Sequence, residues 1–127
     1  MKKVVMTDKA PAPLPGAPYS QAIKADGLVF CSGQLPIDPK TGKFASEGIE
    51  GQTKQVLTNL QAVLEASGSS LQKVVKTTVL LSDLGDFGAM NSIYSEFFKK
   101  DPPARTTFQA GKLPMNAKIE IDAIALC

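Results

Sequence analysis

Two charged side chains near the end of the chain have the chemistry to act together on a small acid. Arg105 and Glu120 stand in two neighbouring β-like runs, on faces where ordinary packing gives them no role. A guanidinium offers a planar fork of donors that suits a carboxylate, and a glutamate can hold or activate a water molecule. The pair therefore indicates chemistry on a small carboxylate-bearing molecule.

Position alone leaves a plainer interpretation of each residue open. Arg105 could be a solvated or ion-paired surface arginine, but Pro102-Pro103 gives it a rigid approach, which favours an aimed anion clamp. Glu120 shares its predicted strand face with Asp122, which has similar chemistry. The alternation of polar residues therefore does not choose between these two carboxylates.

Three further places carry polar groups where a ligand could bind. Tyr19 follows a proline-rich lead-in and is either a lid over the edge of the core or a ligand contact. Ser32-Gly33-Gln34 interrupts an apolar run, and glycine weakens a strand, so we expect either a β-bulge or a ligand close to the main chain. Asn91, on a predicted helix, is interpreted as solvated or as bonding a nearby loop.

The composition excludes several classes of active site. The chain has no histidine, which removes Ser-His-Asp and Cys-His catalysis and nearly every metal site that uses imidazole. Its two cysteines, Cys31 and Cys127, cannot form a four-thiolate site, and the missing cysteine framework fits a reducing compartment without a bridge between them. We therefore expect no metal.

Charge and hydropathy limit the partners and the location. The net charge of +2, with basic doublets only at Lys2-Lys3 and Lys99-Lys100, argues against a nucleic-acid surface. The N-terminus has neither the apolar stretch of a signal peptide nor the composition of a transit peptide. No run approaches the roughly 20 apolar residues of a membrane span. We expect a cytoplasmic protein that does not enter a membrane.

The 127 residues, 43% of them hydrophobic, predict one globular domain over 1–127. Residues 9–18 hold four of the nine prolines and predict a stiff, extended lead-in. Period-2 and β-branched patterns predict strands at Ser20–Lys24, Leu28–Gln34, Val74–Leu81, Arg105–Leu113 and Lys118–Leu126, with Lys3–Met6 as an added edge strand. Asp26-Gly27 predicts a hairpin between the first two of these five strands, and Pro36–Gly42 is interpreted as a loop.

Apolar residues spaced three and four apart predict two helices. The first runs from Gly48 to Ser67, with polar residues such as Gln52 and Asn59 mostly facing away from the core. The second runs from Phe87 to Lys99, with Asp86 as its N-cap. Packing both helices on one face of a mixed sheet leaves a semi-polar, threonine-rich face open, which favours self-association.

The spacing of Arg105 and Glu120 has a geometric consequence. If the last two strands form a hairpin turning near Met115, Glu120 sits opposite Gly111 and roughly 15–20 Å from Arg105. One small ligand then cannot touch both within one subunit. Either these strands are not simple neighbours, or Arg105 of one copy meets Glu120 of another. We favour the second explanation, and a fully active monomer would contradict it.

Six short motifs in this sequence jointly resemble the Rid (YjgF-like) family of imine deaminases, over about residues 8 to 126. They are Pro18-Tyr19-Ser20-Gln21, Ser32-Gly33-Gln34-Leu35-Pro36, Val75-Lys76-Thr77-Thr78-Val79, Asn91-Ser92-Ile93-Tyr94, Pro103-Ala104-Arg105 and Ile119-Glu120-Ile121. The resemblance implies a chorismate-mutase-like α+β fold in the order β-β-β-α-β-α-β-β. It also implies a homotrimer with clefts between subunits, and hydrolysis of 2-imino acids to 2-keto acids and ammonia without a cofactor.

The resemblance also implies a role for each candidate residue. Arg105 would grip the substrate carboxylate, Glu120 would hold the attacking water, and Tyr19 would close the pocket from a neighbouring subunit. Further ligand contacts would come from Ser32, Gly33, Thr107 and Asn91. Thr107 replaces a cysteine found in several relatives, and its implied role is a backbone carbonyl that positions water. The sequence also departs from the family pattern at Ala17 and Thr106.

Three other functions remain open from the sequence. A non-catalytic trimer that senses a keto acid would keep Arg105 but tolerate Glu120→Gln. A ribonuclease or translation inhibitor is disfavoured by the low charge, the missing histidine and the lack of clustered aromatic and basic residues. A redox-activated holdase would need exposed apolar surface, which the sequence does not reveal.

Overall fold

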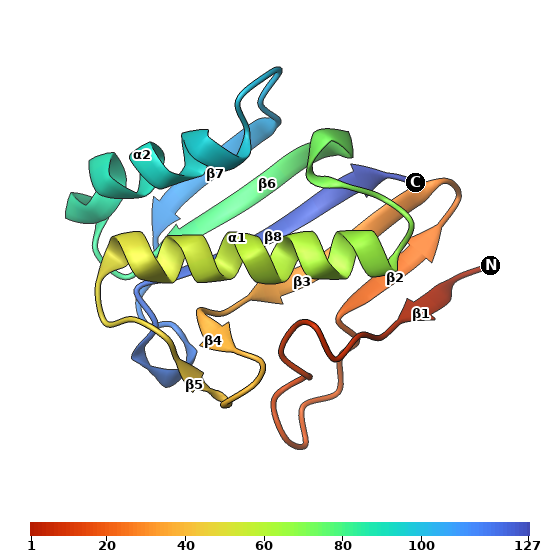
Figure 1. Ribbon diagram of the computed structural model, residues 1–127, viewed down its shortest axis with the longest axis horizontal. Helices are drawn as coiled ribbons and strands as arrows, with labels where there is room; N and C mark the ends of the chain where they lie inside the picture. Colours follow the sequence, from red (N-terminus) through yellow and green to blue (C-terminus); the bar gives the residue numbers. More distant parts are fainter.

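A computed structural model describes residues 1–127 as a six-stranded mixed sheet with two helices packed on one of its faces (Figure 1). The strand order is β1-β2-β3-β8-β6-β7. The elements are β1 (Lys3–Val5), β2 (Ala22–Ala25), β3 (Leu28–Gln34), α1 (Ile49–Ala66), β6 (Val74–Leu81), α2 (Phe87–Phe97), β7 (Ala104–Gln109) and β8 (Ile119–Leu126). The predicted α+β class and the order of its main elements are confirmed.

The N-terminal half of the sheet follows the predicted turn chemistry. Asp26 and Gly27, between β2 and β3, have φ of 50° and 77°, the left-handed pair that a two-residue hairpin turn requires. The predicted edge strand is present as β1, which pairs antiparallel with β2. The segment interpreted as a loop contains a short separate ladder, β4 (Ile37–Asp38) with β5 (Lys43–Phe44), closed by hydrogen bonds from Thr41 and Gly42 to the Asp38 carbonyl.

The last two strands do not form the hairpin that the sequence left open; they are not neighbours, which was the first of the two alternatives and the one not favoured. β6 lies between β7 and β8, parallel to β7 and antiparallel to β8. The cause is the helical crossover: β6, α2 and β7 form a β-α-β unit, whose two strands run parallel side by side. β7 also ends at Gln109, four residues earlier than predicted, and a 3₁₀ turn at Pro114–Asn116 leads into β8.

Helix α1 buries its predicted apolar stripe, but two of its amides were placed wrongly. Gln52 and Asn59 are buried rather than solvated. Asn59 donates to the carbonyls of Leu35 and Ile37 at 3.0 and 2.8 Å, and Gln52 accepts from the Lys118 N–H at 2.8 Å. Each amide satisfies backbone groups of a loop that packs against the helix, which an apolar side chain could not do.

Helix α2 begins differently from the prediction. Asp86 makes no side-chain cap; Asp83 instead accepts a hydrogen bond from the Gly85 N–H at 2.8 Å. A 3₁₀ turn at Leu84–Asp86 therefore precedes the helix and satisfies the backbone donors that a cap would take.

The two faces of the sheet differ as predicted. One face packs against the helices through a core that includes Val29, Val79 and Ile121. The other face carries no helix (Figure 1). Phe30 and Phe108, whose side chains point to that face, are exposed.

The two cysteines are free thiols, Cys31 in the core and Cys127 exposed at the end of the chain. Burial, and then the nearby Asp122, raise the pKa of Cys31 to about 12, so this thiol is inert at neutral pH. None of the helices has both the length and the apolar character needed to cross a membrane.

Candidate active site

Glu120 lies on the helix-free face of the sheet, directly over Gly33. Its neighbours Ile119 and Ile121 face the core, so alternation turns Glu120 to the other side. The register of β3 against β8 shifts between Cys31 and Gln34, which confirms the predicted bulge. A Cβ atom added to Gly33 would overlap Oε2 and Cδ of Glu120, so the missing side chain is the space that the carboxyl group occupies.

The surroundings separate Glu120 from Asp122, which the sequence could not do. Asp122 is exposed, whereas Glu120 is half-buried. Burial raises the pKa of Glu120, and the Asp122 charge raises it further. A carboxyl group with a raised pKa takes up and returns a proton more readily near neutral pH. The structure therefore distinguishes Glu120 from Asp122 as the more buried carboxyl group and the one with the raised pKa.

Glu120 opens into a cleft of about 260 Å³ that three other candidate residues share. The cleft is lined by Leu14, Tyr19, Ser32, Gly33, Leu35, Pro114 and Glu120. Ser32 donates its hydroxyl hydrogen to the Ser20 carbonyl at 2.6 Å, so its oxygen lone pairs are left to accept from a ligand. The Tyr19 hydroxyl accepts from the Leu14 N–H at 2.9 Å, which holds the ring at the rim.

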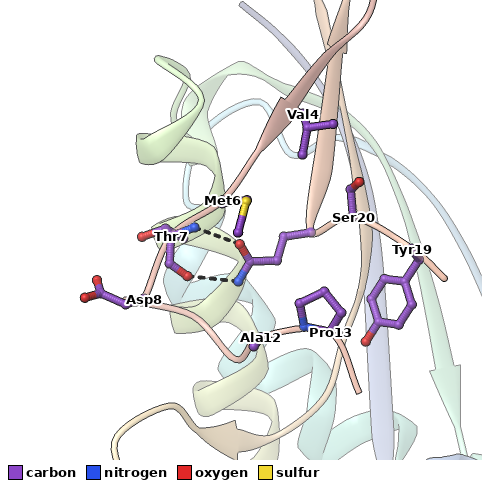
Figure 2. Close-up of a pocket in the computed structure, with 9 residues that line it drawn as sticks. Val4, Met6, Thr7, Asp8, Ala12, Pro13, Tyr19 and Ser20 are labelled. Carbon is purple, nitrogen blue, oxygen red and sulfur yellow. Dashed lines mark hydrogen bonds between the residues drawn. The ribbon is translucent and has the colours of Figure 1, made fainter. Parts of the chain in front are cut away.

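The side chain of Gln21 holds the proline-rich lead-in in place through hydrogen bonds, a role that its position in the sequence does not indicate. The buried Gln21 side chain accepts from the Thr7 N–H at 2.8 Å and donates to the carbonyls of Thr7 and Pro11 at 3.0 and 2.8 Å. Figure 2 shows the bonds to Thr7 beside an apolar pocket of about 430 Å³. Tyr19 also lines this pocket. Gln21 thus fixes the segment that carries Leu14 and Tyr19.

Arg105, the only arginine in the chain, lies on the opposite face of the sheet. It is aligned with the buried Thr77 of β6, on the side that the helices cover. Its guanidinium carbon is 4.8 Å from the centre of the Tyr94 ring and 5.5 Å from that of Phe87, both on α2. Stacking uses the flat faces of a guanidinium and leaves its N–H edge free for an anion.

Two buried polar atoms without hydrogen-bond partners accompany Arg105. They are Oδ1 of Asn91 and Oγ1 of Thr107. Thr107 shares the strand face of Arg105, and Asn91 follows Phe87 by four residues and so shares its helix face. Asn91 is therefore neither solvated nor bonded to a loop through this oxygen, contrary to the sequence-based interpretation. Buried oxygen atoms without a partner in the protein are rare, so these two stand out as groups to which a small polar molecule could bond.

The candidate residues thus form two groups on opposite faces of the sheet. The first comprises Glu120, Tyr19, Ser32 and Gly33, and the second comprises Arg105, Thr107 and Asn91. Across β6, Arg105 and Glu120 are offset by three residues and two strand spacings, about 14 Å in all, and they point to opposite faces. No group of three His, Cys, Asp or Glu side chains is placed to hold a metal ion.

Comparison with known proteins gives matches along almost the whole chain. The profile of the family described as Ribonuc_L-PSP, endoribonuclease L-PSP, matches residues 8–127. The chain is 56% identical over 124 residues to Reactive Intermediate Deaminase A, chloroplastic, of Arabidopsis thaliana, covering 98% of this chain and 65% of that protein. It is 42% identical over 126 residues to the 2-iminobutanoate/2-iminopropanoate deaminase of Homo sapiens, covering 99% and 90%. The solved structure of E. coli TdcF with bound serine matches with a TM-score of 0.93 at 35% identity, over 98% of both chains.

Proposed function

The chain belongs to the endoribonuclease L-PSP (Rid) family, and on that premise we propose that it hydrolyses reactive 2-imino acids to 2-keto acids and ammonia. Substrates of the size of 2-iminobutanoate and 2-iminopropanoate, which the name of the human relative prints, fit the cleft of about 260 Å³. The observation that carries the proposal is the half-buried Glu120 carboxyl group, with its raised pKa, held over Gly33 in that cleft.

The reaction needs orientation more than a strong nucleophile. An imine carbon is electrophilic, and more so when its nitrogen is protonated, so the protein has to place water and substrate correctly. Arg105 binds the substrate carboxylate through its N–H edge. Ser32 and the buried oxygens of Asn91 and Thr107 accept hydrogen bonds from the substrate nitrogen or the water.

Proton transfer through Glu120 completes the reaction without a cofactor. Glu120 takes a proton from water as the oxygen bonds to the imine carbon, which gives a carbinolamine. The nitrogen enters protonated, so this first product is neutral. Glu120 then returns the proton to the nitrogen, the C–N bond breaks and ammonia leaves, and Glu120 takes the hydroxyl proton as the keto oxygen forms; this proton replaces the one that protonated the imine. The overall balance is one imine and one water to one keto acid and one ammonia.

The active unit in this proposal is a homotrimer of one-domain chains, residues 1–127, with each cleft between two protomers. Its support is the opposite orientation of Arg105 and Glu120, together with a helix-free sheet face that leaves Phe30 and Phe108 exposed. Tyr19 lines the same cleft as Glu120. In the trimer, one protomer therefore supplies both Tyr19 and Glu120, and the neighbouring protomer supplies Arg105.

The proposed role is repair of metabolite damage in the cytoplasm. The 2-imino acids are released when pyridoxal-phosphate dehydratases act on threonine or serine, and these enzymes are partners through their product, with no contact required. One relative is named chloroplastic, so cell fractionation with an antibody to this chain is the test of the compartment. Recovery in an organelle fraction would contradict the cytoplasmic assignment.

Arg105→Ala tests the proposed function. In an assay where a threonine dehydratase generates 2-iminobutanoate, the variant should lose the acceleration of 2-oxobutanoate release, because the substrate carboxylate has no clamp. Lys54→Ala, which removes one positive charge from an exposed position of α1, should retain it. Gel filtration checks that both variants keep the wild-type oligomer. Unchanged turnover by Arg105→Ala would remove the clamp from the proposal.

RNA cleavage is a second candidate, because the description of the family profile names an endoribonuclease. The net charge of +2 and the absence of histidine argue against it. Incubation of the purified protein with labelled RNA tests this candidate. Cleavage that Glu120→Gln and Arg105→Ala both abolish would place it in the same site, whereas no cleavage would remove it.

A further inference from the structure

The guanidinium of Arg105 rests on an aromatic ring that is itself fixed in the core. Tyr94 is only 5% exposed, and its ring packs against that of Phe98 at a tilt of 39°, with 4.7 Å between centroids. Phe87, the other ring near Arg105, is 39% exposed and lies farther from the guanidinium. Of the two rings that contact Arg105, Tyr94 is therefore the closer and the more rigidly held.

The orientation of the Tyr94 ring is set by a buried hydroxyl pair. Its Oη lies 2.7 Å from Oγ1 of Thr77, which is completely buried in the middle of β6. Thr77 is also the residue of β6 directly aligned with Arg105 on β7. Helix α2 is thus tied through one hydrogen bond to the strand position beside Arg105.

Such an arrangement restricts the plane of the guanidinium. A cation above an aromatic face is attracted by the ring quadrupole, and a planar guanidinium gains most when it lies flat against the ring. Its N–H edge then points along a direction that the ring determines. Burial raises the pKa of Tyr94 by more than the bond to Thr77 and the charge of Arg105 lower it. The pKa is therefore raised overall, and the side chain is a neutral phenol.

We propose that Tyr94 is a positioning residue: its ring aims the Arg105 guanidinium at the substrate carboxylate, and the Thr77 hydroxyl holds the ring. This inference rests on the proposed function, because it takes a carboxylate as the ligand of Arg105. Loss of the ring leaves the positive charge of Arg105 in place but no longer fixes the orientation of the guanidinium plane. A bidentate contact to a carboxylate depends on that direction, whereas a simple ion pair does not.

The test compares Tyr94→Leu with Tyr94→Phe in the coupled assay. Tyr94→Leu removes the ring and should raise KM about 3- to 30-fold, with a smaller change in kcat. Tyr94→Phe combined with Thr77→Val keeps the ring, loses the bond that holds it and leaves no buried hydroxyl without a partner, so its KM should lie between those of the wild type and Tyr94→Leu. Thermal melting verifies that each variant is folded.

A background variant separates positioning from general damage to the fold. In R105K the cation is a point charge without a plane, so adding Tyr94→Leu should change KM by less than about twofold. A purely structural role of Tyr94 predicts the same fold-change in both backgrounds, and that result would overturn the inference.

A spectroscopic readout covers the case in which Tyr94→Leu does not fold. Arg105 is the only arginine, so its Nε–Hε group gives a single NMR signal. In the wild type and in Tyr94→Phe/Thr77→Val, this signal should shift on titration with 2-oxobutanoate and should carry the ring-current displacement of a stacked guanidinium. A signal at the position of a free arginine would overturn the positioning role.

Different results would contradict the proposed function and the positioning role of Tyr94. If Arg105→Ala retains full turnover, the proposed function falls and the positioning role falls with it. If Arg105→Ala loses turnover while Tyr94→Leu is folded and keeps the wild-type KM, only the role of Tyr94 falls.

Discussion

Residue types alone could not separate Glu120 from Asp122, because both are carboxylates on one face of β8. The difference lies in what surrounds them: Glu120 is half-buried over the bulge at Gly33, and Asp122 is exposed. The sequence did mark the glycine as a break in an apolar strand. It could not show that the space left by the missing side chain of Gly33 is filled by Glu120, 87 positions later, since that contact exists only through the β3–β8 pairing.

Gly33→Ala should inactivate the protein without unfolding it. The added methyl group overlaps the Glu120 carboxyl group, which must move away from its place over position 33. We expect kcat in the coupled assay to fall at least about tenfold, with a cooperative melting transition retained. Gly88→Ala is the matched control, because a Cβ there meets nothing within 4 Å and helix α2 gains about 0.5–1 kcal/mol of stability. Equal activity of the two variants would contradict the packing argument.

Glu120→Gln should separate catalysis from ligand binding. Removing the proton carrier should lower kcat about 10²-fold or more, whereas binding of 2-oxobutanoate, followed by calorimetry, should persist because Arg105 is intact. A protein that only senses keto acids would show no functional loss in this variant. A sensor would accelerate no keto-acid release in either form, whereas undiminished turnover in the variant would contradict the proton-transfer role of Glu120.

The same substitution should stabilise the protein at neutral pH. The pKa of Glu120 is raised by folding, so its contribution to stability is present below the unfolded value of about 4.3 and is lost as the pH rises through the folded pKa. Glu120→Gln removes that loss, so its melting temperature should exceed that of the wild type at pH 7. The difference should shrink as the pH falls below about 4. A constant difference across this range would contradict the raised pKa.

At the scale of the elements, periodicity predicted almost everything that depends on one element alone. The apolar stripe of α1, the strand β6 and the Asp26-Gly27 turn were all predictable because each pattern reports the burial or backbone of its own segment. Whether β7 and β8 form a hairpin could not be decided from the sequence, because strand order depends on the crossover through α2. The buried amides of Gln52 and Asn59 were missed because their partners are loop backbone groups far away in the sequence.

Gln21→Leu should loosen the lead-in that carries Tyr19. The change leaves the backbone groups of Thr7 and Pro11 without their buried partner, at a cost of about 1–3 kcal/mol for each unpaired group. Limited proteolysis within residues 7–19 should become faster, and deaminase activity should fall with it. The control is Gln61→Leu, which removes an amide bonded only to Glu65 on an exposed turn of α1. Wild-type protection of the lead-in in Gln21→Leu would contradict the role of Gln21.

At the scale of the whole molecule, the sequence led to an active site shared between protomers by way of a hairpin that does not exist. The structure gives a different reason for the same arrangement. Arg105 faces α2 at the edge of the sheet, and Glu120 opens onto the helix-free face, with the interior strand β6 between them. This geometry supports the proposal that each cleft takes Arg105 and Glu120 from two different copies of the chain.

Subunit complementation tests this arrangement most directly. Arg105→Ala and Glu120→Gln are each expected to be inactive, because every cleft lacks one of the two residues. After the two variants are co-refolded at equal concentration, about a quarter of the clefts in a trimer should pair an intact Arg105 with an intact Glu120 from the adjacent protomer. We predict recovery of about a quarter of the wild-type rate of keto-acid release. If the mixture forms mixed oligomers and stays as inactive as its components, both residues act within one protomer and the account is contradicted.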